Sequence, residues 1–237
     1  MPLITLFSAT PTPVAMEVFS PPTTVVKRGV SVVVAYGTDG LSTASKPLIE
    51  NFCMALANDG YTVAVPRFLE ITHTAPGFGP VTADLTSANL ALWTSSLVEG
   101  VSWCVTNQGN NRIGLIGFSL GGYMAARTAL ATPVKCLIDF FGPMKTFGLI
   151  PWPTGEAFDS IKAAKLPPAQ IHHGNQDIIV RPSESTALHA WMAAAHISCE
   201  LNTDYDCGHP QQPEGNPWTA SEQSKATPRV LKILATI

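Results

Sequence analysis

Short apolar runs alternate with longer amphipathic segments along most of the chain. From about residue 30 onward, runs rich in β-branched residues are followed by stretches in which apolar side chains recur at helical spacing. The clearest run, at residues 30–35, is apolar apart from Ser31, as expected of a strand that is buried on both faces. This alternation is typical of βαβ units built around a mostly parallel sheet.

The same pattern predicts most of the secondary structure. Further strands are expected at residues 61–66, 112–117, 134–140, 169–173 and 197–204. Helices are expected at 42–60, 82–106, from 119 onward, at 183–195 and at 220–234, and residues 4–7 and 14–19 are candidates for an antiparallel pair at the sheet edge. The fold class is therefore α/β, with a twisted, mostly parallel sheet of about eight strands and helices on both faces.

Two long segments lack a clear period. Residues 68–81 hold two Pro and two Gly and are interpreted as a surface loop. Residues 142–168 also contain Pro and Gly, and they form a second long connection with the length to cover a pocket. The sequence leaves open which of these two segments lines a substrate cleft.

Length and composition narrow the class of protein. With 237 residues, 46% of them hydrophobic and 13% charged, one globular domain spanning residues 1–237 is expected. The net charge is −3 and the 14 Lys and Arg are scattered, so a nucleic acid partner is not expected. No apolar run approaches the roughly 20 residues that cross a bilayer, and no basic signal segment opens the chain. A cytoplasmic protein without membrane association is predicted, and its oligomeric state is left open.

The five cysteines give no sign of a disulfide framework or a metal site. They are odd in number and widely separated, and no two of them have CxxC spacing. We interpret them as buried, reduced thiols.

The most specific motif is the G-x-S-x-G sequence centred on Ser119. It lies between an apolar run, IGLIG, and a stretch of helical pattern that begins near Tyr123. The spacing suits a tight turn from strand to helix, in which Gly117 and Gly121 let backbones pass closely while the serine side chain is held up. Ser119 is therefore the candidate nucleophile.

A serine hydroxyl needs a base and an orienting acid, and in hydrolases of this type they follow in the order acid, then His. Asp177 comes shortly after the strand expected at 169–173, and His209 follows the strand expected at 197–204. Both therefore lie at carboxyl ends of strands, where open α/β sheets bind ligands. Asp139 falls inside a strand instead. The predicted triad is Ser119, Asp177 and His209, with Gly208 giving the backbone freedom to present the imidazole.

Adjacent histidines at 172 and 173 could suggest a metal site, but neighbouring residues on a strand face opposite sides. They cannot both reach one ion, and no HExxH spacing supplies other ligands. We expect packing and hydrogen bonding for His172 and His173, and neither a metal nor another cofactor.

The remaining site residues are predicted from the loops that adjoin Ser119. Backbone N–H groups of Leu120 and Thr38 are the candidate oxyanion hole, with Gly37 as the alternative to Thr38. Four aromatic residues flank the site and are candidates for a substrate pocket, although aromatics at strand ends are more often core. These are Tyr36, Phe118, Phe140 and Phe141.

Over almost its whole length the chain resembles the dienelactone hydrolase family of α/β-hydrolases. The resemblance is carried by VVVAYGTDG, by GFSLGG, by HGNQD and by the pair Gly208-His209, in the family's order. It implies an α/β-hydrolase fold, a triad of Ser119, Asp177 and His209, and an oxyanion hole at Thr38 and Leu120.

Two departures from that family narrow the expected substrate. The namesake enzymes use a cysteine nucleophile with a glutamate in the first loop, where this chain has Ser119 and Gly37. They also hold a substrate carboxylate with arginines, whereas HPQQPEGNPW after His209 has no Arg or Lys. Neutral small esters or lactones are therefore expected rather than anionic lactones.

Three hypotheses follow for function. The first is a serine carboxylesterase that works through an acyl-enzyme on Ser119. The second keeps the triad but passes the acyl group to an acceptor other than water, as an acyltransferase or perhydrolase. The third is a binding module without turnover on a hydrolase scaffold.

Overall fold

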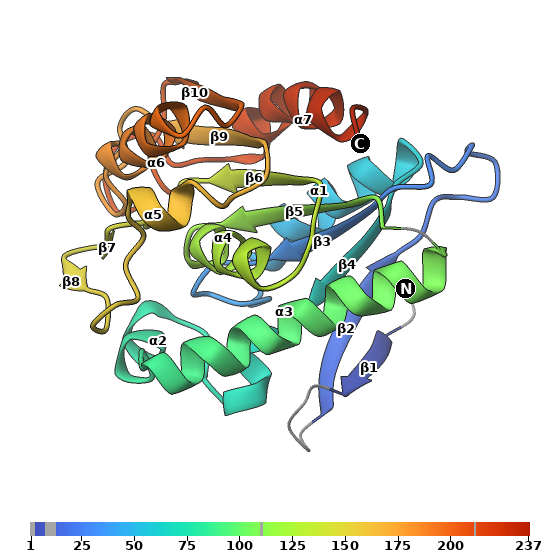
Figure 1. The fold of residues 1–237 in the computed structure, drawn as a ribbon, viewed down its shortest axis with the longest axis horizontal. Coiled ribbons are helices and arrows are strands. Elements are labelled where there is room, and N and C mark those ends of the chain that lie inside the picture. Colours follow the sequence, from blue (N-terminus) through green and yellow to red (C-terminus); the bar gives the residue numbers. More distant parts are fainter. Residues whose placement is uncertain (1–2, 8–12, 110, 211) are drawn as a thin grey trace.

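One eight-stranded sheet organises the computed structural model, which describes residues 3–7, 13–109, 111–210 and 212–237 (Figure 1). The strand order is β1-β2-β4-β3-β5-β6-β9-β10. Pairing is parallel from β4 to β10 and antiparallel only at β1–β2 and β2–β4. The strands are β1 Leu3–Phe7, β2 Pro13–Phe19, β3 Ser31–Ala35, β4 Thr62–Pro66, β5 Ile113–Phe118, β6 Cys136–Phe140, β9 Ala169–Gly174 and β10 Cys199–Tyr205.

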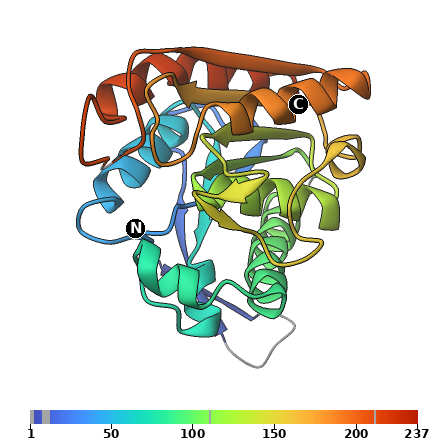
Figure 2. The ribbon, with the colours of Figure 1, turned by 90° about the vertical axis from the view of Figure 1, so that its left-hand side faces the viewer.

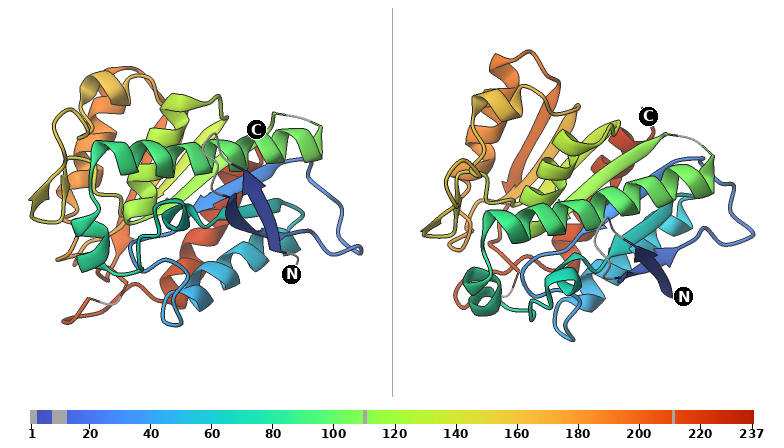
Figure 3. Two further views of the ribbon diagram at one scale, coloured as in Figure 1. Left: turned by 90° about the horizontal axis from the view of Figure 1, so that it is seen from below. Right: turned by 60° about the horizontal axis from the view of Figure 1, so that its bottom comes forward.

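The helices cover both faces of this sheet. Helices α3 and α4 pack together on one face with α6 beyond them, while α1 and α7 contact each other on the opposite face (Figures 1 and 2). The long α3 runs diagonally across the sheet (Figure 3). Their bounds are α1 Lys46–Asn58, α2 Phe78–Ala83, α3 Ser87–Gln108, α4 Leu120–Ala131, α5 Ser160–Ala163, α6 Ser183–Ala194 and α7 Ala220–Leu234. None of the described helices is long and apolar enough to cross a membrane.

The apolar pattern explains the central strands. Every residue of β3, β4, β5, β6 and β9 is buried, as expected where helices cover both faces of a parallel sheet. The edge strand β10 is different, because most of its residues are partly or fully exposed. The predicted α/β fold, with its mostly parallel sheet and its antiparallel pair at the edge, is confirmed.

The segment 68–81 was wrongly predicted as a surface loop. It contains the 3-10 helix η1, Phe68–Thr72, and the first residues of α2. Phe68 and Val81 are fully buried, so these short helices pack on the core. The Pro and Gly residues of the segment lie just before α2 or in its first turn. The long helix also begins later than expected, at Ser87, because the side chain of Thr86 accepts a hydrogen bond from Asn89 N–H and caps it there.

The segment 142–168 holds a small two-stranded sheet, β7 Thr146–Phe147 and β8 Ile150–Pro151, and then α5.

All five cysteines are free, and four of them are buried while Cys199 is partly exposed.

Asp139 is a charged residue type in the middle of the buried strand β6. Its side chain is fully buried against Gly122 and Gly142, and neither carboxyl oxygen has a hydrogen-bond partner among the described residues. Burial raises the pKa of Asp139 to about 7. The folded chain therefore keeps a proton on this carboxyl up to neutral pH.

We expect Asp139→Asn to change the pH dependence of stability. Between pH about 4, where an unfolded aspartate ionises, and pH about 7, the folded chain binds more protons at this site, so the wild type loses stability as pH rises. The neutral amide should raise Tm at pH 8, by about 2–4 °C for each kcal/mol gained, and change it little at pH 4. Thermal unfolding at both pH values measures this, and an equal fall in Tm at both would contradict it.

Candidate active site

Ser119 occupies a strained turn between β5 and α4. Its φ of 53° and ψ of −123° lie in a region that non-glycine residues rarely adopt, at a cost on the order of 1–3 kcal/mol. Two backbone hydrogen bonds hold the turn: Ser119 N–H donates to the carbonyl of Phe140 at 2.9 Å, and Gly122 N–H donates to the carbonyl of Ser119 at 2.8 Å. Such geometry presents the hydroxyl above the sheet.

The two motif glycines are required by the close approach of backbones. A Cβ on Gly117 would lie 2.0 Å from the carbonyl oxygen of Gly121, and a Cβ on Gly121 would lie 2.0 Å from that of Ala35. Side chains at either position would therefore push α4 away from the sheet. The reason predicted for this spacing is confirmed by these distances.

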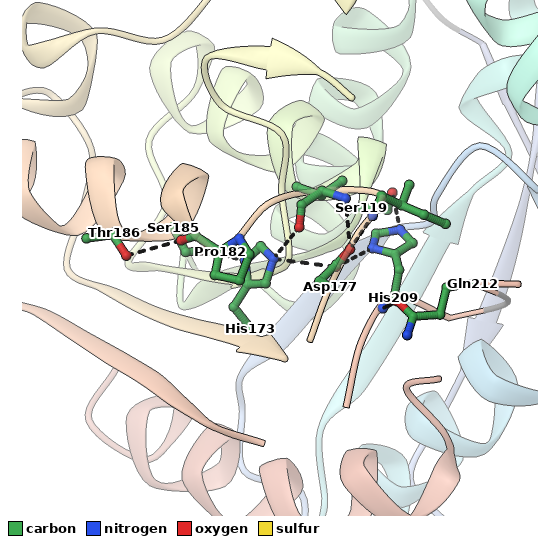
Figure 4. Close-up of polar contacts among 10 residues, drawn as sticks. Ser119, His173, Asp177, Pro182, Ser185, Thr186, His209 and Gln212 are labelled. Carbon is green, nitrogen blue, oxygen red and sulfur yellow. Dashed lines mark hydrogen bonds and ion pairs between the residues drawn. The ribbon is translucent and has the colours of Figure 1, made fainter. Parts of the chain in front are cut away.

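Ser119, His209 and Asp177 form one hydrogen-bonded chain (Figure 4). His209 Nδ1 lies 2.7 Å from Asp177 Oδ2, and His209 Nε2 lies 2.9 Å from Ser119 Oγ. Because a carboxylate only accepts, Nδ1 carries the proton and Nε2 is left to accept from the hydroxyl. The three residues follow the ends of β5, β9 and β10, so parallel strands bring them to one edge of the sheet.

The carboxylate of Asp177 is buried and well bonded. Its side chain has no exposed surface, and Oδ1 accepts from the N–H groups of Ile179 at 2.9 Å and Val180 at 2.8 Å. Burial by itself would raise the pKa of Asp177, but the ring N–H groups of His173 and His209 outweigh it and hold the pKa below its usual range. Asp177 is therefore ionised and can stabilise a positive charge on His209.

The backbones that carry the acid and the base pack directly on each other. A Cβ on Gly174 would lie 2.2 Å from the carbonyl oxygen of Cys207, and the same carbonyl accepts from Gln176 N–H at 2.9 Å. The sequence Gly174 to Asp177 is thus joined to the residues that precede His209. This contact explains the glycine in HGNQD.

Gly208 is required because there is no room for a side chain at this position, and not because its backbone needs conformational freedom. Its φ is not in the positive region, but a Cβ there would lie 1.8 Å from Gln212 Oε1. That oxygen accepts from the backbone N–H of His209 at 3.0 Å. The flexibility predicted for Gly208 was therefore the wrong reason, and Gln212, which the sequence did not single out, fixes the backbone of His209.

The predicted oxyanion donors are the backbone N–H groups of Leu120, Thr38 and Gly37. None of them donates a hydrogen bond among the turn, loop and cap bonds of the described residues. Leu120 is the first residue of α4, and Gly37 passes so close to Ser119 that a Cβ there would lie 3.3 Å from the serine Cβ. The first loop therefore crosses directly over the candidate nucleophile.

A cavity of about 780 Å³ opens beside Ser119 and His209, which both line it. Two of the predicted pocket aromatics, Phe118 and Phe141, also line it. The ring of Phe141 meets that of His209 edge to face, with centroids 4.8 Å apart. Phe141 has a φ of 46°, so a second strained residue adjoins the site.

Tyr36 and Phe140 were wrongly placed in the pocket. Neither lines the cavity, and both are buried in the core. Tyr36 stacks on Phe68 with centroids 4.6 Å apart, while Phe140 stacks between Phe118 and His172, 4.6 Å from each. Aromatic residues at these strand ends pack against neighbouring strands and helices, and the sequence pattern does not separate this role from pocket lining.

Both long segments contribute walls to the cavity. Phe78 at the start of α2 stacks on Phe147 of β7 with centroids 5.2 Å apart, and Gly148 follows in the hairpin. Leu48 of α1 and Trp218 also line the cavity. Apart from Ser119, His209 and Asp39, most of the lining is apolar, and none of the described lining residues is Lys or Arg.

The adjacent histidines point to opposite faces of β9. His172 contacts Tyr205 Oη and Gln170 Oε1, whereas His173 contacts Ser185 Oγ and the carbonyl of Val180. Within the described ranges, no three His, Cys, Asp or Glu side chains form a group that could hold a metal ion.

Comparison with protein-family models identifies the family of the chain. The sequence model of the dienelactone hydrolase family matches residues 17–237, and no curated protein matches the sequence. A putative dienelactone hydrolase from Klebsiella pneumoniae subsp. pneumoniae superposes with a TM-score of 0.76 at 18% identity over 100% of both chains.

Two other solved structures are similar. An α/β serine hydrolase without a lid from Xanthomonas campestris gives a TM-score of 0.62 at 21% identity, over 88% of this chain and 85% of its own. A dienelactone hydrolase-like promiscuous phosphotriesterase from metagenomic libraries gives 0.72 at 16% identity, over 99% and 97%. At these identities the structural likeness concerns the fold.

We expect Gly121→Ala to destabilise the chain by about 1–3 kcal/mol or to prevent folding, because the new methyl overlaps the carbonyl of Ala35. The matched control is Gly79→Ala in α2, where the site is exposed and a Cβ meets no atom within 4 Å. That variant should stay within about 0.5 kcal/mol of wild type. Urea unfolding measures both, and similar stabilities for the two variants would contradict the packing argument.

Proposed function

The chain belongs to the dienelactone hydrolase family of α/β-hydrolases, and we propose that it is a serine hydrolase that cleaves neutral carboxylic esters. One observation carries the proposal: Ser119, His209 and Asp177 form a continuous hydrogen-bonded chain beside a mainly apolar cavity. A metal or cofactor is not required by this chemistry.

In this mechanism Ser119 Oγ attacks the ester carbonyl while His209 Nε2 takes the hydroxyl proton. Negative charge develops on the carbonyl oxygen, which accepts from the backbone N–H groups of Leu120 and Thr38. His209 then protonates the leaving alcohol, and an acyl-enzyme remains on Ser119. Water attacks that ester by the same route, and Asp177 stabilises the imidazolium in both halves.

The cavity favours uncharged substrates. Burial of alkyl or aryl groups against its apolar lining favours binding. A substrate carboxylate, by contrast, would lose its hydration without meeting a Lys or Arg among the described lining residues. Asp39, the one carboxylate among the described lining residues, would repel such a group further. Small neutral esters or lactones are the substrates that this lining suits.

We expect Ser119→Ala to lower kcat/KM for an activated ester by about 10⁴-fold or more, since it removes the nucleophile. The wild type should show a burst of alcohol release and react with a fluorophosphonate probe at Ser119, located by peptide mass spectrometry. Ser102→Ala on the exposed side of α3 is the control and should behave as wild type. Undiminished turnover in Ser119→Ala, or no reaction of the probe with the wild type, would reject a serine mechanism.

We expect a p-nitrophenyl ester of butyric acid to be cleaved with a kcat/KM at least about tenfold higher than the hemisuccinate ester, after correction for their reactivity with hydroxide. The reason is the cost of burying a carboxylate that finds no cation. Asp39→Asn should raise kcat/KM for the hemisuccinate alone, by up to about fivefold. Equal rates for the two esters would show that the lining does not select against charge.

A further inference from the structure

His172 and His173 are both fully buried in β9, yet they occupy different surroundings. The ring of His172 stacks on Phe140, on the side of the sheet that carries Trp218. His173 lies on the other side, against Ser185 near the start of α6. His173 lies beside Asp177 of the candidate triad (Figure 4).

Both nitrogens of His173 are engaged. Nε2 lies 2.8 Å from the carbonyl oxygen of Val180, and Nδ1 lies 2.6 Å from Ser185 Oγ. A carbonyl oxygen only accepts, so Nε2 carries a proton and donates it. In the neutral ring Nδ1 then accepts from the Ser185 hydroxyl, and both ends of the imidazole are fixed.

The partner of His173 is the same residue that supports Asp177. Val180 donates its N–H to Asp177 Oδ1 at 2.8 Å while its carbonyl accepts from His173. His173 Nε2 also lies 3.4 Å from Asp177 Oδ2, the oxygen that accepts from His209. His173 therefore contacts the loop from Asp177 to Val180 at the carboxylate and at the opposite end.

We propose that His173 is a positioning residue of the active centre, which holds the loop of Asp177 and Val180 so that the carboxylate keeps facing His209. The proposal rests on the proposed function, because it assigns a supporting role to the same triad. The low pKa of Asp177 is consistent with it, since the N–H of His173 favours the ionised carboxylate.

An apolar residue at position 173 would fill the same space but lose this contact. The carbonyl of Val180 and the hydroxyl of Ser185 would then be buried without their partner. The loop can satisfy the carbonyl only by moving, and that movement displaces Asp177. A shift of about 1 Å in a catalytic group can cost about 100-fold in rate.

The experiment compares His173→Leu with His173→Gln. Leucine removes the donor, whereas the amide N–H of glutamine can reach the carbonyl of Val180. We expect His173→Leu to lower kcat for a neutral activated ester by about 10- to 100-fold with KM changed less than about threefold, and His173→Gln to recover most of the loss. The downfield NMR signal of the proton between His209 and Asp177 should weaken in the leucine variant and return in the glutamine variant.

His172→Leu is the matched control, because it is adjacent, equally buried and also hydrogen-bonded at both nitrogens, to Tyr205 at 2.7 Å and Gln170 at 2.8 Å. It should lose stability yet keep kcat and the downfield signal in the fraction that is folded. Equal losses of kcat in the two leucine variants, or wild-type kcat and an unchanged signal in His173→Leu, would overturn the proposal.

Ser185→Ala serves if His173→Leu does not fold, because it removes only the partner of Nδ1. A lower kcat with unchanged KM and a weaker downfield signal supports the proposal, and no change in either overturns it. Probe labelling of the wild type at Ser119 separates the two hypotheses: without labelling the proposed function fails, whereas labelling and turnover that do not depend on His173 reject only this inference.

Discussion

The hydrogen bond between His209 and Asp177 is the contact on which the site depends, because it decides which nitrogen of the imidazole is free to meet Ser119. A carboxylate can serve this purpose only while it is ionised, and burial opposes ionisation. The chain resolves that conflict by supplying N–H groups from Ile179, Val180 and the two histidine rings. The backbone N–H groups of the loop after β9 thus bind the carboxylate of Asp177, which belongs to the same loop.

Sequence and structure agree best where chemistry imposes the spacing. The turn around Ser119 was predictable because its glycines are needed wherever a strand, a sharp turn and a helix meet at close range. Asp177 and His209 were predictable as partners because both follow strands of a parallel sheet, whose carboxyl ends share one edge. The motif therefore located Ser119, and the parallel topology brought the other two side chains to the same edge of the sheet.

The sequence could not reveal which buried residues touch which. Tyr36 and Phe140 stand at strand ends like Phe118 and Phe141, yet neighbouring strands and helices cover the first pair and leave the second at the cavity. In the sequence His173 looked equivalent to its neighbour His172. The two side chains differ because they lie on opposite faces of β9 and contact different residues. Likewise, residues 68–81 were misjudged because turn-forming residues also bound short helices that pack on a core.

The placement of His209 beyond β10 has a consequence for how the protein resists stress. β10 is the edge strand of the sheet, and among the described strands it pairs only with β9. Its register is irregular near Tyr205, and much of it faces solvent. Strands of this kind open locally at a lower free energy than the buried strands around β5. The proposed general base, His209, therefore follows one of the least protected strands of the sheet, whereas the proposed nucleophile, Ser119, follows one of the most protected. Heat or denaturant should therefore abolish activity first by local unfolding of β10 and the loop that carries His209, while the buried strands of the sheet remain folded.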